Sequence, residues 1–190
     1  MPRASAAEVL AALAPVIDRR GVRWYVFGAQ AVMVYGQPRL SDDVDVTVEV
    51  APVDLRALVD DAVAAGFAEE LPDDDEFLAV TRVVPLRHRA TNIPVDMVLA
   101  GPGLEELFLD RAAPCDLGGV TVPVIAPEHL VVTKILAGRD KDRSDALSVL
   151  LRQGDTLDLG EIRSLLTDLE QALGQSDLLP VLDQLIAELE

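Results

Sequence analysis

Two aspartates, Asp43 and Asp45, lie two residues apart in a segment that otherwise has the composition of a β-strand. Side chains alternate between the two faces of a strand, so both carboxylates are expected on one face. Val44, Val46 and Val48 then share the opposite face, where they can be buried. Neighbouring like charges repel, and a hard divalent cation with oxygen ligands is the partner that best relieves the repulsion.

A short apolar strand over residues 22–27 lies just upstream and runs into Gly28 and Ala29. Glycine at such a turn lets the backbone come close to a phosphate group. The turn and the paired aspartates together predict a metal-dependent nucleotide site.

Asp96 is a third carboxylate of interest, because it is the one charge in the apolar strand predicted over residues 93–99. A lone aspartate in such a strand is costly unless it is paired or binds a metal. Asp43, Asp45 and Asp96 are therefore expected to form a cluster across neighbouring strands. Such a cluster can hold Mg²⁺ or Mn²⁺, which activates an attacking oxygen and stabilises a leaving pyrophosphate. The carboxylate nearest the acceptor can also serve as general base.

A basic motif follows in the C-terminal third of the chain. Lys134 lies on an apolar helix face, where a phosphate or a carboxylate is expected to compensate its ammonium. Arg139 and Lys141 lie near the start of the next helix, which itself favours anions. Asp142 is interpreted as the N-cap of that helix. Asp145, one turn on, is expected to hold Lys134 or Lys141 in place.

Composition limits the classes of function. The chain has 190 residues and a net charge of −17, which disfavours nonspecific binding to nucleic acid. Cys115 is the only cysteine, so an intrachain disulfide and a cysteine-based zinc site are excluded. No apolar run approaches the roughly 18 residues of a membrane span, and the N-terminus lacks a signal-peptide pattern. We therefore expect a cytoplasmic protein with no membrane partner.

Hydrophobic periodicity predicts an α+β fold, in which a mixed β-sheet core is flanked by helices and followed by a helical region. We expect residues 1–125 to form the core and residues 126–190 to form helices packed on it. A capping box at Ser5 and Glu8 is expected to begin the first helix. Strands are predicted over 22–27, 44–50, 77–86 and 93–99, with a hairpin between Cys115 and Val124. Helices are predicted over 5–21, 29–35, 52–66, 103–112, from 127 to a break at 138–141, and over 142–152, 159–172 and 177–189.

The ordered motifs resemble those of the nucleotidyltransferase superfamily with the DNA polymerase β-like fold. The motifs are Gly28-Ala29, Arg39-x-Ser41-x-Asp43-x-Asp45, and then Asp96. With the later Lys134…Lys141-Asp142…Asp145, they are similar to bacterial AbiEii-like nucleotidyltransferases, which include toxins of type IV toxin–antitoxin systems. The resemblance covers about residues 22–150. Ala29 departs from the glycine or serine usual at that position, although it keeps a small side chain and a backbone N–H.

The resemblance implies roles for individual residues. Asp43, Asp45 and Asp96 would be catalytic and bind Mg²⁺. Ser41 would lie near the phosphates and Arg39 near the entrance of the strand. The residues assigned to nucleotide binding are Gly28, Ala29, Arg39, Ser41, Lys134, Arg139, Lys141 and Asp145.

The activity expected from this resemblance is Mg²⁺-dependent transfer of a nucleoside monophosphate from an NTP to an acceptor hydroxyl. The acceptor class stays open between tRNA, protein and small molecule, and an antitoxin protein is a candidate partner. One alternative is a non-catalytic nucleotide-binding module of the same fold. Another is an antibiotic nucleotidyltransferase, because an acidic protein attracts cationic drugs. The plainest alternative is an α/β domain whose aspartates cap turns, but it explains poorly why Asp43, Asp45, Asp96 and Lys134 all lie in apolar elements.

Overall fold

The computed structural model describes residues 6–70 and 75–189, which group into two compact units. The first unit contains the described residues up to Gln30 together with Leu40–Ile125. The second contains Ala31–Arg39 and the described residues from Ala126 onward. The sequence-based division into domains 1–125 and 126–190 stays a prediction. The structure adds that the short segment 31–39 groups with the C-terminal helices.

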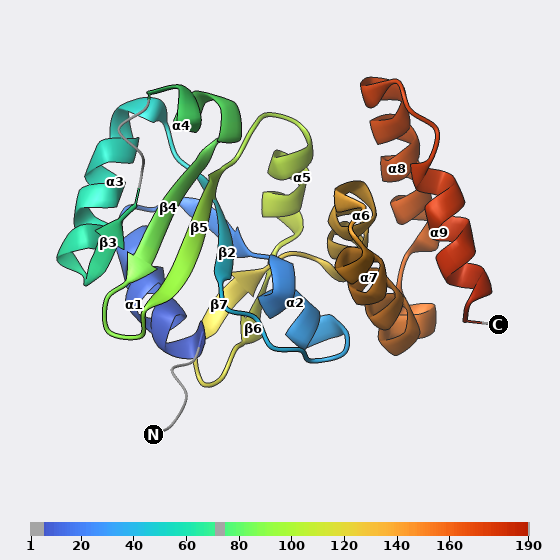
Figure 1. The fold of residues 1–190 in the computed structure, drawn as a ribbon, viewed down its shortest axis with the longest axis horizontal. Helices are drawn as coiled ribbons and strands as arrows, with labels where there is room; N and C mark the ends of the chain where they lie inside the picture. Colours follow the sequence, from blue (N-terminus) through green and yellow to red (C-terminus); the bar gives the residue numbers. More distant parts are fainter. Residues whose placement is uncertain (1–5, 71–74, 190) are drawn as a thin grey trace. The chain divides into compact units, whose positions relative to one another are not determined.

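A mixed seven-stranded sheet lies in the described part of the first unit, as predicted for an α+β fold (Figure 1). Its order is β3-β4-β5-β2-β1-β7-β6. The pairs β2–β5 and β1–β7 are parallel, and the other neighbours are antiparallel. The strands are β1 (Arg23–Val26), β2 (Val44–Glu49), β3 (Phe67–Glu69), β4 (Val83–His88), β5 (Ile93–Leu99), β6 (Ala113–Asp116) and β7 (Thr121–Val124).

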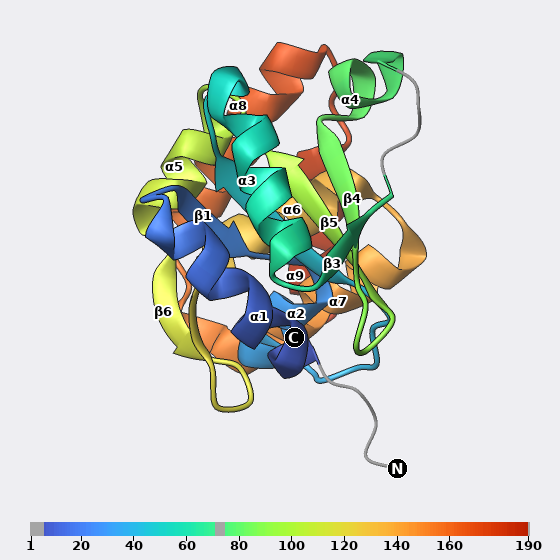
Figure 2. The ribbon, with the colours of Figure 1, turned by 90° about the vertical axis from the view of Figure 1, so that its left-hand side faces the viewer.

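The two faces of this sheet have different surroundings. Helices α1 (Ala6–Arg19) and α3 (Pro52–Ala64) lie side by side on one face (Figures 1 and 2). Trp24 of β1 points to that face, where its indole donates to Asp18 of α1 at 2.9 Å. Tyr25 points to the opposite face and meets Phe108 of α5 (Leu104–Arg111), with ring centroids 6.4 Å apart. Adjacent positions of β1 thus identify which helix covers which face.

Helices make up the second unit. It contains the C-terminal part of α2 (Gly28–Tyr35), then α6 (Pro127–Ala137), α7 (Asp140–Gln153), a 3₁₀ turn (Gly154–Thr156), α8 (Leu159–Leu173) and α9 (Leu178–Ala187). Proline suits the first position of α6, and Gly138 ends it in the left-handed conformation with φ 67°. Leu130, Val149 and Leu182 are fully buried, so α6, α7 and α9 share one apolar core.

The structure corrects one predicted strand. Residues 77–86 do not form a single strand: Asp75–Thr81 is helix α4, and β4 begins only at Val83. Arg82 separates the two elements with φ 54°, a conformation that neither helix nor strand continues. The edge strand Phe67–Glu69 was not predicted.

The remaining predicted elements of the first unit are found within two residues of their expected bounds, including the hairpin of β6 and β7. The expected capping box lies partly outside the described residues, because Ser5 is not among them. Among the described residues, no helix is both long and apolar enough to cross a membrane.

Candidate active site

Asp45 and Asp96 are direct neighbours on the central strands β2 and β5 of the first unit. The two strands are parallel, and Asp45 is the register partner of Asp96. Partner residues on adjacent strands have Cα atoms about 4.8 Å apart and side chains on the same face. Thr47 follows on this face and is the register partner of Tyr25, so the two aspartates lie on the α5 side of the sheet. The predicted juxtaposition of these carboxylates is therefore present in the backbone.

Asp43 is the third member of this acidic cluster, which we define as Asp43, Asp45 and Asp96. It lies two residues before Asp45 and just ahead of the first residue of β2. Burial raises the pKa of Asp96, and the negative charge of Asp43 raises it further. The predicted repulsion between clustered carboxylates therefore acts within the first unit. Val44, Val46 and Val48 are fully buried on the opposite face, as expected.

The turn at Gly28 fits closely against the acidic cluster. Gly28 has φ 61°, and a Cβ atom built on it would overlap the carboxylate of Asp45. The backbone continues this contact, because Phe27 donates its N–H to the carbonyl of Asp45 at 3.1 Å. Ala29 is 4% exposed, which explains why a small residue follows the glycine. Glycine is needed at position 28 for both its conformation and its lack of a side chain.

Ser41 lies in the irregular segment that leads into β2. Its hydroxyl donates to Oδ1 of Asp43 at 2.5 Å. The hydroxyl thus orients an acidic side chain; its expected position near the phosphates stays a prediction. Sequence analysis missed a second residue that contacts Asp43, the buried Gln30, whose side-chain amide donates to the Asp43 carbonyl at 3.2 Å. A polar side chain in the first turn of an apolar helix was the available signal.

Whether the acidic cluster can hold a divalent metal depends on the kind of donor atoms it offers and on whether its three carboxylates point to one place. Carboxylate oxygens, such as those of this cluster, are the donors that Mg²⁺ and Mn²⁺ prefer. In the described residues, however, no three Asp, Glu, His or Cys side chains converge closely enough to bind one ion. The carboxylate of Asp45 rests instead against Gly28. The donor chemistry and the register of Asp45 with Asp96 fit a metal, although the three carboxylates do not surround one point among the described residues.

A second group of charges lies in the helical unit. The ammonium of Lys134 is buried on α6 and lies 2.9 Å from Oδ1 of Asp142 and 2.8 Å from Oδ2 of Asp145, both on α7. The sequence-based expectation that a carboxylate compensates Lys134 is confirmed. Its predicted contact with nucleotide stays a prediction.

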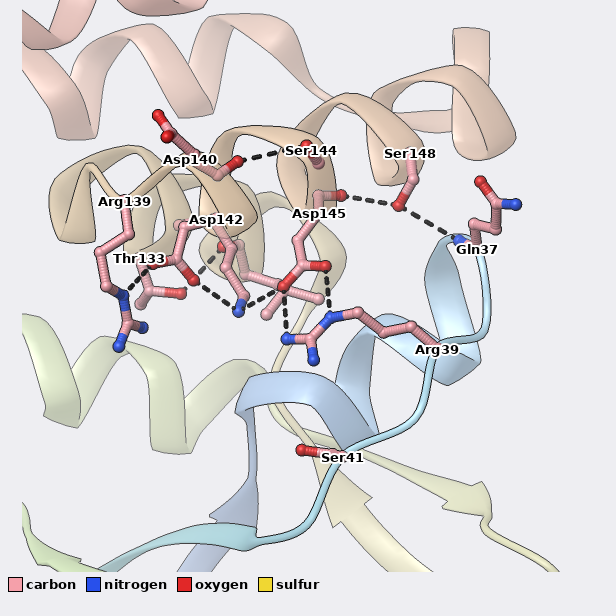
Figure 3. A network of polar contacts seen from close by, with 12 residues as sticks. Gln37, Arg39, Ser41, Thr133, Arg139, Asp140, Asp142, Ser144, Asp145 and Ser148 are labelled. Carbon is pink, nitrogen blue, oxygen red and sulfur yellow. Dashed lines mark hydrogen bonds and ion pairs between the residues drawn. The ribbon is translucent and has the colours of Figure 1, made fainter.

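Two arginines complete this cation–carboxylate network, which consists of Arg39, Lys134, Arg139, Asp142 and Asp145 (Figure 3). Arg39 donates from Nε to Oδ1 of Asp145 at 2.8 Å and from Nη2 to Oδ2 at 2.9 Å. Arg139 donates from Nε to Oδ2 of Asp142. Three cations face two carboxylates, so the network carries one excess positive charge in a chain of net charge −17.

The electrostatics of the two carboxylates follow from these contacts. Burial alone would raise the pKa of each. Hydrogen bonds from Arg39 and Lys134 nevertheless hold the pKa of Asp145 below its usual value. Arg139 and Lys134 lower the pKa of Asp142 in the same way. Both carboxylates are therefore ionised at neutral pH, and the network is a fixed array of charges.

The interpretation of Asp142 as an N-cap is wrong. Helix α7 begins at Asp140 with Arg139 in the N-cap position, and Asp142 is fully buried inside the first turn. A buried carboxylate requires a cationic partner, and Lys134 and Arg139 fill that role. Lys141 is exposed near the start of α7, and no contact between it and the network is found in the described part of the chain.

The predicted site residues thus fall into two groups. Gly28, Ala29, Ser41 and the acidic cluster belong to the first unit, whereas Arg39, Lys134, Arg139, Lys141 and Asp145 belong to the second. The first group offers carboxylate oxygens beside a glycine turn, which suits a metal ion bound to phosphate. The second offers guanidinium groups in fixed orientations, which suit phosphate oxygens.

Comparison with known proteins adds an independent finding. The model of a family described as "Nucleotidyl transferase of unknown function (DUF2204)" matches residues 6–171, most of the chain. A comparison with curated proteins found no match.

Solved structures with the same fold include several nucleotidyltransferases. The antibiotic-resistance factor ANT(2″)-Ia, solved in complex with adenylyl-2″-tobramycin, has a TM-score of 0.60 and 12% identity, covering 87% of this chain and 97% of that chain. An antigenic nucleotidyltransferase-like protein from Paracoccidioides brasiliensis has a TM-score of 0.55 and 20% identity, with 93% and 91% covered. The lincosamide antibiotic adenylyltransferase LnuA, bound to lincomycin, has a TM-score of 0.55 and 12% identity, with 77% and 97% covered. At these identities the similarity shows the fold alone.

Proposed function

The chain belongs to the nucleotidyl transferase family DUF2204, and on that premise we propose that it transfers a nucleoside monophosphate from an NTP to an acceptor hydroxyl. The acceptor oxygen forms a bond to the α-phosphorus, the bond from that phosphorus to the β-bridging oxygen breaks, and pyrophosphate leaves. The acceptor hydroxyl proton passes to a base. The single observation that carries the proposal is the placement of Asp45 and Asp96 as register partners beside Asp43 and Gly28.

The acidic cluster is the proposed site of catalysis. Asp43, Asp45 and Asp96 would hold Mg²⁺ or Mn²⁺, which when bound activates the acceptor oxygen and stabilises the departing pyrophosphate. Asp96 has a raised pKa, a property that suits a group accepting a proton from the acceptor hydroxyl. Ser41 orients the Asp43 carboxylate through its 2.5 Å hydrogen bond.

Nucleotide binding is proposed for the turn and for the basic residues. Gly28 and Ala29 are buried at the start of α2 beside the acidic cluster, and their lack of bulk is proposed to let the triphosphate approach the first N–H groups of that helix. Arg39, Arg139 and Lys141 are the cations proposed to face phosphate. Lys134 acts at the same network by neutralising the two buried carboxylates that hold the arginines.

A small molecule is the acceptor class that we favour. The net charge of −17 attracts cationic molecules and repels a nucleic acid backbone. The structural neighbours ANT(2″)-Ia and LnuA were solved with adenylyl-2″-tobramycin and lincomycin, respectively, and support the same class. Transfer to tRNA or protein, as a toxin with an antitoxin partner in the AbiEii-like manner, is the second candidate. It rests on the motif Lys134…Lys141-Asp142…Asp145. The expected cytoplasmic location stays a prediction.

Nucleotide binding by matched variants tests the donor half of this proposal. Each of the four NTPs is titrated with Mg²⁺ into the unsubstituted chain, Asp43→Asn and Asp45→Asn. Metal-dependent affinity should fall in both variants, because each loses a carboxylate oxygen donor. Asp42→Asn is the control, since Asp42 is exposed and adjacent in sequence. Equal metal-dependent affinity in all four proteins would show that the acidic cluster is not the site. Binding without pyrophosphate release would favour a non-catalytic module.

A further inference from the structure

Gln30 is a buried amide side chain beside the acidic cluster. It lies in the first turn of α2 and is 3% exposed. Its Nε2 donates to the main-chain carbonyl of Asp43 at 3.2 Å. Its Oε1 is also buried, and no hydrogen-bond partner for it is found among the described residues. The side chain therefore makes one specific bond while leaving an acceptor unsatisfied.

The bond matters because of where Asp43 lies in the backbone. The ladder between β2 and β5 begins one residue later, where Val44 is paired with Val95. The segment from Gln37 to Asp43 has no regular secondary structure, so neither a helix nor a ladder fixes the Asp43 peptide. The amide of Gln30 supplies the donor that a neighbouring strand would otherwise provide. Ser41 holds the side chain of the same residue.

We propose that Gln30 is a positioning residue of the acidic cluster, which fixes the Asp43 carboxylate by tying its main chain to the start of α2. The inference rests on the proposed function, because the bond from Gln30 would serve metal binding by the acidic cluster. It also explains the unsatisfied Oε1. A buried acceptor without a partner lowers stability, and an apolar side chain of similar length would avoid that loss. The feature of Gln30 that an apolar residue could not reproduce is its bond to the Asp43 carbonyl.

The test substitutes the amide without changing its length. Gln30→Met removes the donor and the unsatisfied acceptor together. Gln153→Met is the matched control, because Gln153 also donates from Nε2 to a main-chain carbonyl, that of Tyr35, at 2.8 Å. Mn²⁺ alone is titrated into each protein by calorimetry, and urea unfolding is measured in parallel. We expect Gln30→Met to weaken Mn²⁺ binding about tenfold, the value of one net hydrogen bond, with little change in stability, because removal of the buried Oε1 offsets the lost bond to the Asp43 carbonyl. Gln153→Met should leave Mn²⁺ binding unchanged.

Equal Mn²⁺ affinity in Gln30→Met and the unsubstituted chain would overturn the positioning role. A loss of affinity that also occurs in Gln153→Met would overturn it too, by showing a general effect of losing a bond from a glutamine side chain to the main chain. If the unsubstituted chain itself binds no Mn²⁺, the metal-dependent function fails first, and the positioning role with it.

If Gln30→Met does not fold, the bond can be tested by hydrogen exchange in the unsubstituted chain without metal. In NMR spectra of the unsubstituted chain, the side-chain NH₂ of Gln30 should be protected from hydrogen exchange, because it is buried and bonded. Exchange as fast as that of the exposed Gln37 side chain would contradict the bond on which the inference depends.

Discussion

Arg39 binds the carboxylate of Asp145 through two hydrogen bonds, at 2.8 and 2.9 Å, although the two residues are 106 positions apart in the sequence. The planar guanidinium matches the planar carboxylate, which makes this the most directional contact of the network. It joins the segment before β2 to helix α7 within the second unit. Arg39, the first residue of the motif Arg39-x-Ser41-x-Asp43-x-Asp45, is therefore held by a residue of the C-terminal basic motif.

Arg39→Lys tests how much of this connection depends on geometry. A lysine keeps the charge but cannot form the two parallel bonds. We expect the free energy of unfolding to fall by about 1–2 kcal/mol in urea titrations. Arg163→Lys, at the exposed pair with Asp183, should change it by less than about 0.5 kcal/mol. Equal effects at both positions would show that only charge matters at Arg39.

Lys134→Met tests the buried centre of the network. The substitution leaves Asp142 and Asp145 buried without the ammonium that both accept from. Removing one partner of a buried ion pair costs about 3–5 kcal/mol, and here each carboxylate would keep a single cationic partner, Arg139 for Asp142 and Arg39 for Asp145. The variant should therefore be strongly destabilised at pH 7, as measured by thermal and urea unfolding. An unfolding free energy within about 1 kcal/mol of the unsubstituted chain would contradict the burial of this charge.

Asp96→Asn should stabilise the fold in a pH-dependent way. The pKa of Asp96 is raised in the folded state by burial and by the charge of Asp43. The folded protein then holds this proton more tightly than the unfolded chain, so the aspartate lowers stability as pH rises through its folded pKa. Asn removes that loss. The gain in unfolding free energy should vanish below the unfolded pKa, near 3.9, and grow as pH rises above it until Asp96 is ionised in the folded state. A gain that does not depend on pH would show a packing effect instead.

Gly28→Ala and Gly21→Ala separate backbone strain from collision. Both glycines have φ near +60°, so an alanine at either position is strained by about 1–2 kcal/mol. A Cβ at position 21 meets nothing within 4 Å, whereas one at position 28 overlaps the carboxylate of Asp45. Gly28→Ala should therefore cost about 1 kcal/mol more than Gly21→Ala in unfolding free energy, because the Asp45 side chain must shift away from the new Cβ. It should also weaken metal binding, and equal costs would contradict the close contact.

Much of the first unit could be predicted because its pattern is local. Alternation of aspartate and valine identified β2 and its buried face, and the hairpin followed from its glycine turn. The prediction of a strand over residues 77–86 was wrong because a short apolar stretch fits either a helix or a strand. The positive φ of Arg82, which ends α4, has no signal in an arginine side chain. The strand Phe67–Glu69 is too short for periodicity to reveal.

The contacts of the site depended on tertiary structure. Asp142 has the sequence context of an N-cap, and only the packing of α6 against α7 shows that it is buried opposite Lys134. Gln30 was missed for a similar reason, since its partner is a main-chain carbonyl 13 residues away. By contrast, the proximity of Asp45 and Asp96 was predicted from the sequence, because a lone aspartate in an apolar strand needs a partner. The register of β2 and β5 places the two residues side by side.

Transfer of labelled nucleotide tests the central claim most directly. NTPs labelled at the α-phosphate are incubated with Mg²⁺ and with aminoglycosides, lincosamides or total tRNA, and both adduct and pyrophosphate are measured. The account predicts a labelled adduct with equal pyrophosphate, at least about 100-fold slower in Asp43→Asn because the acidic cluster is broken, and unchanged in Asp42→Asn. Transfer at the same rate in Asp43→Asn, or no pyrophosphate from any combination of NTP and acceptor, would contradict it.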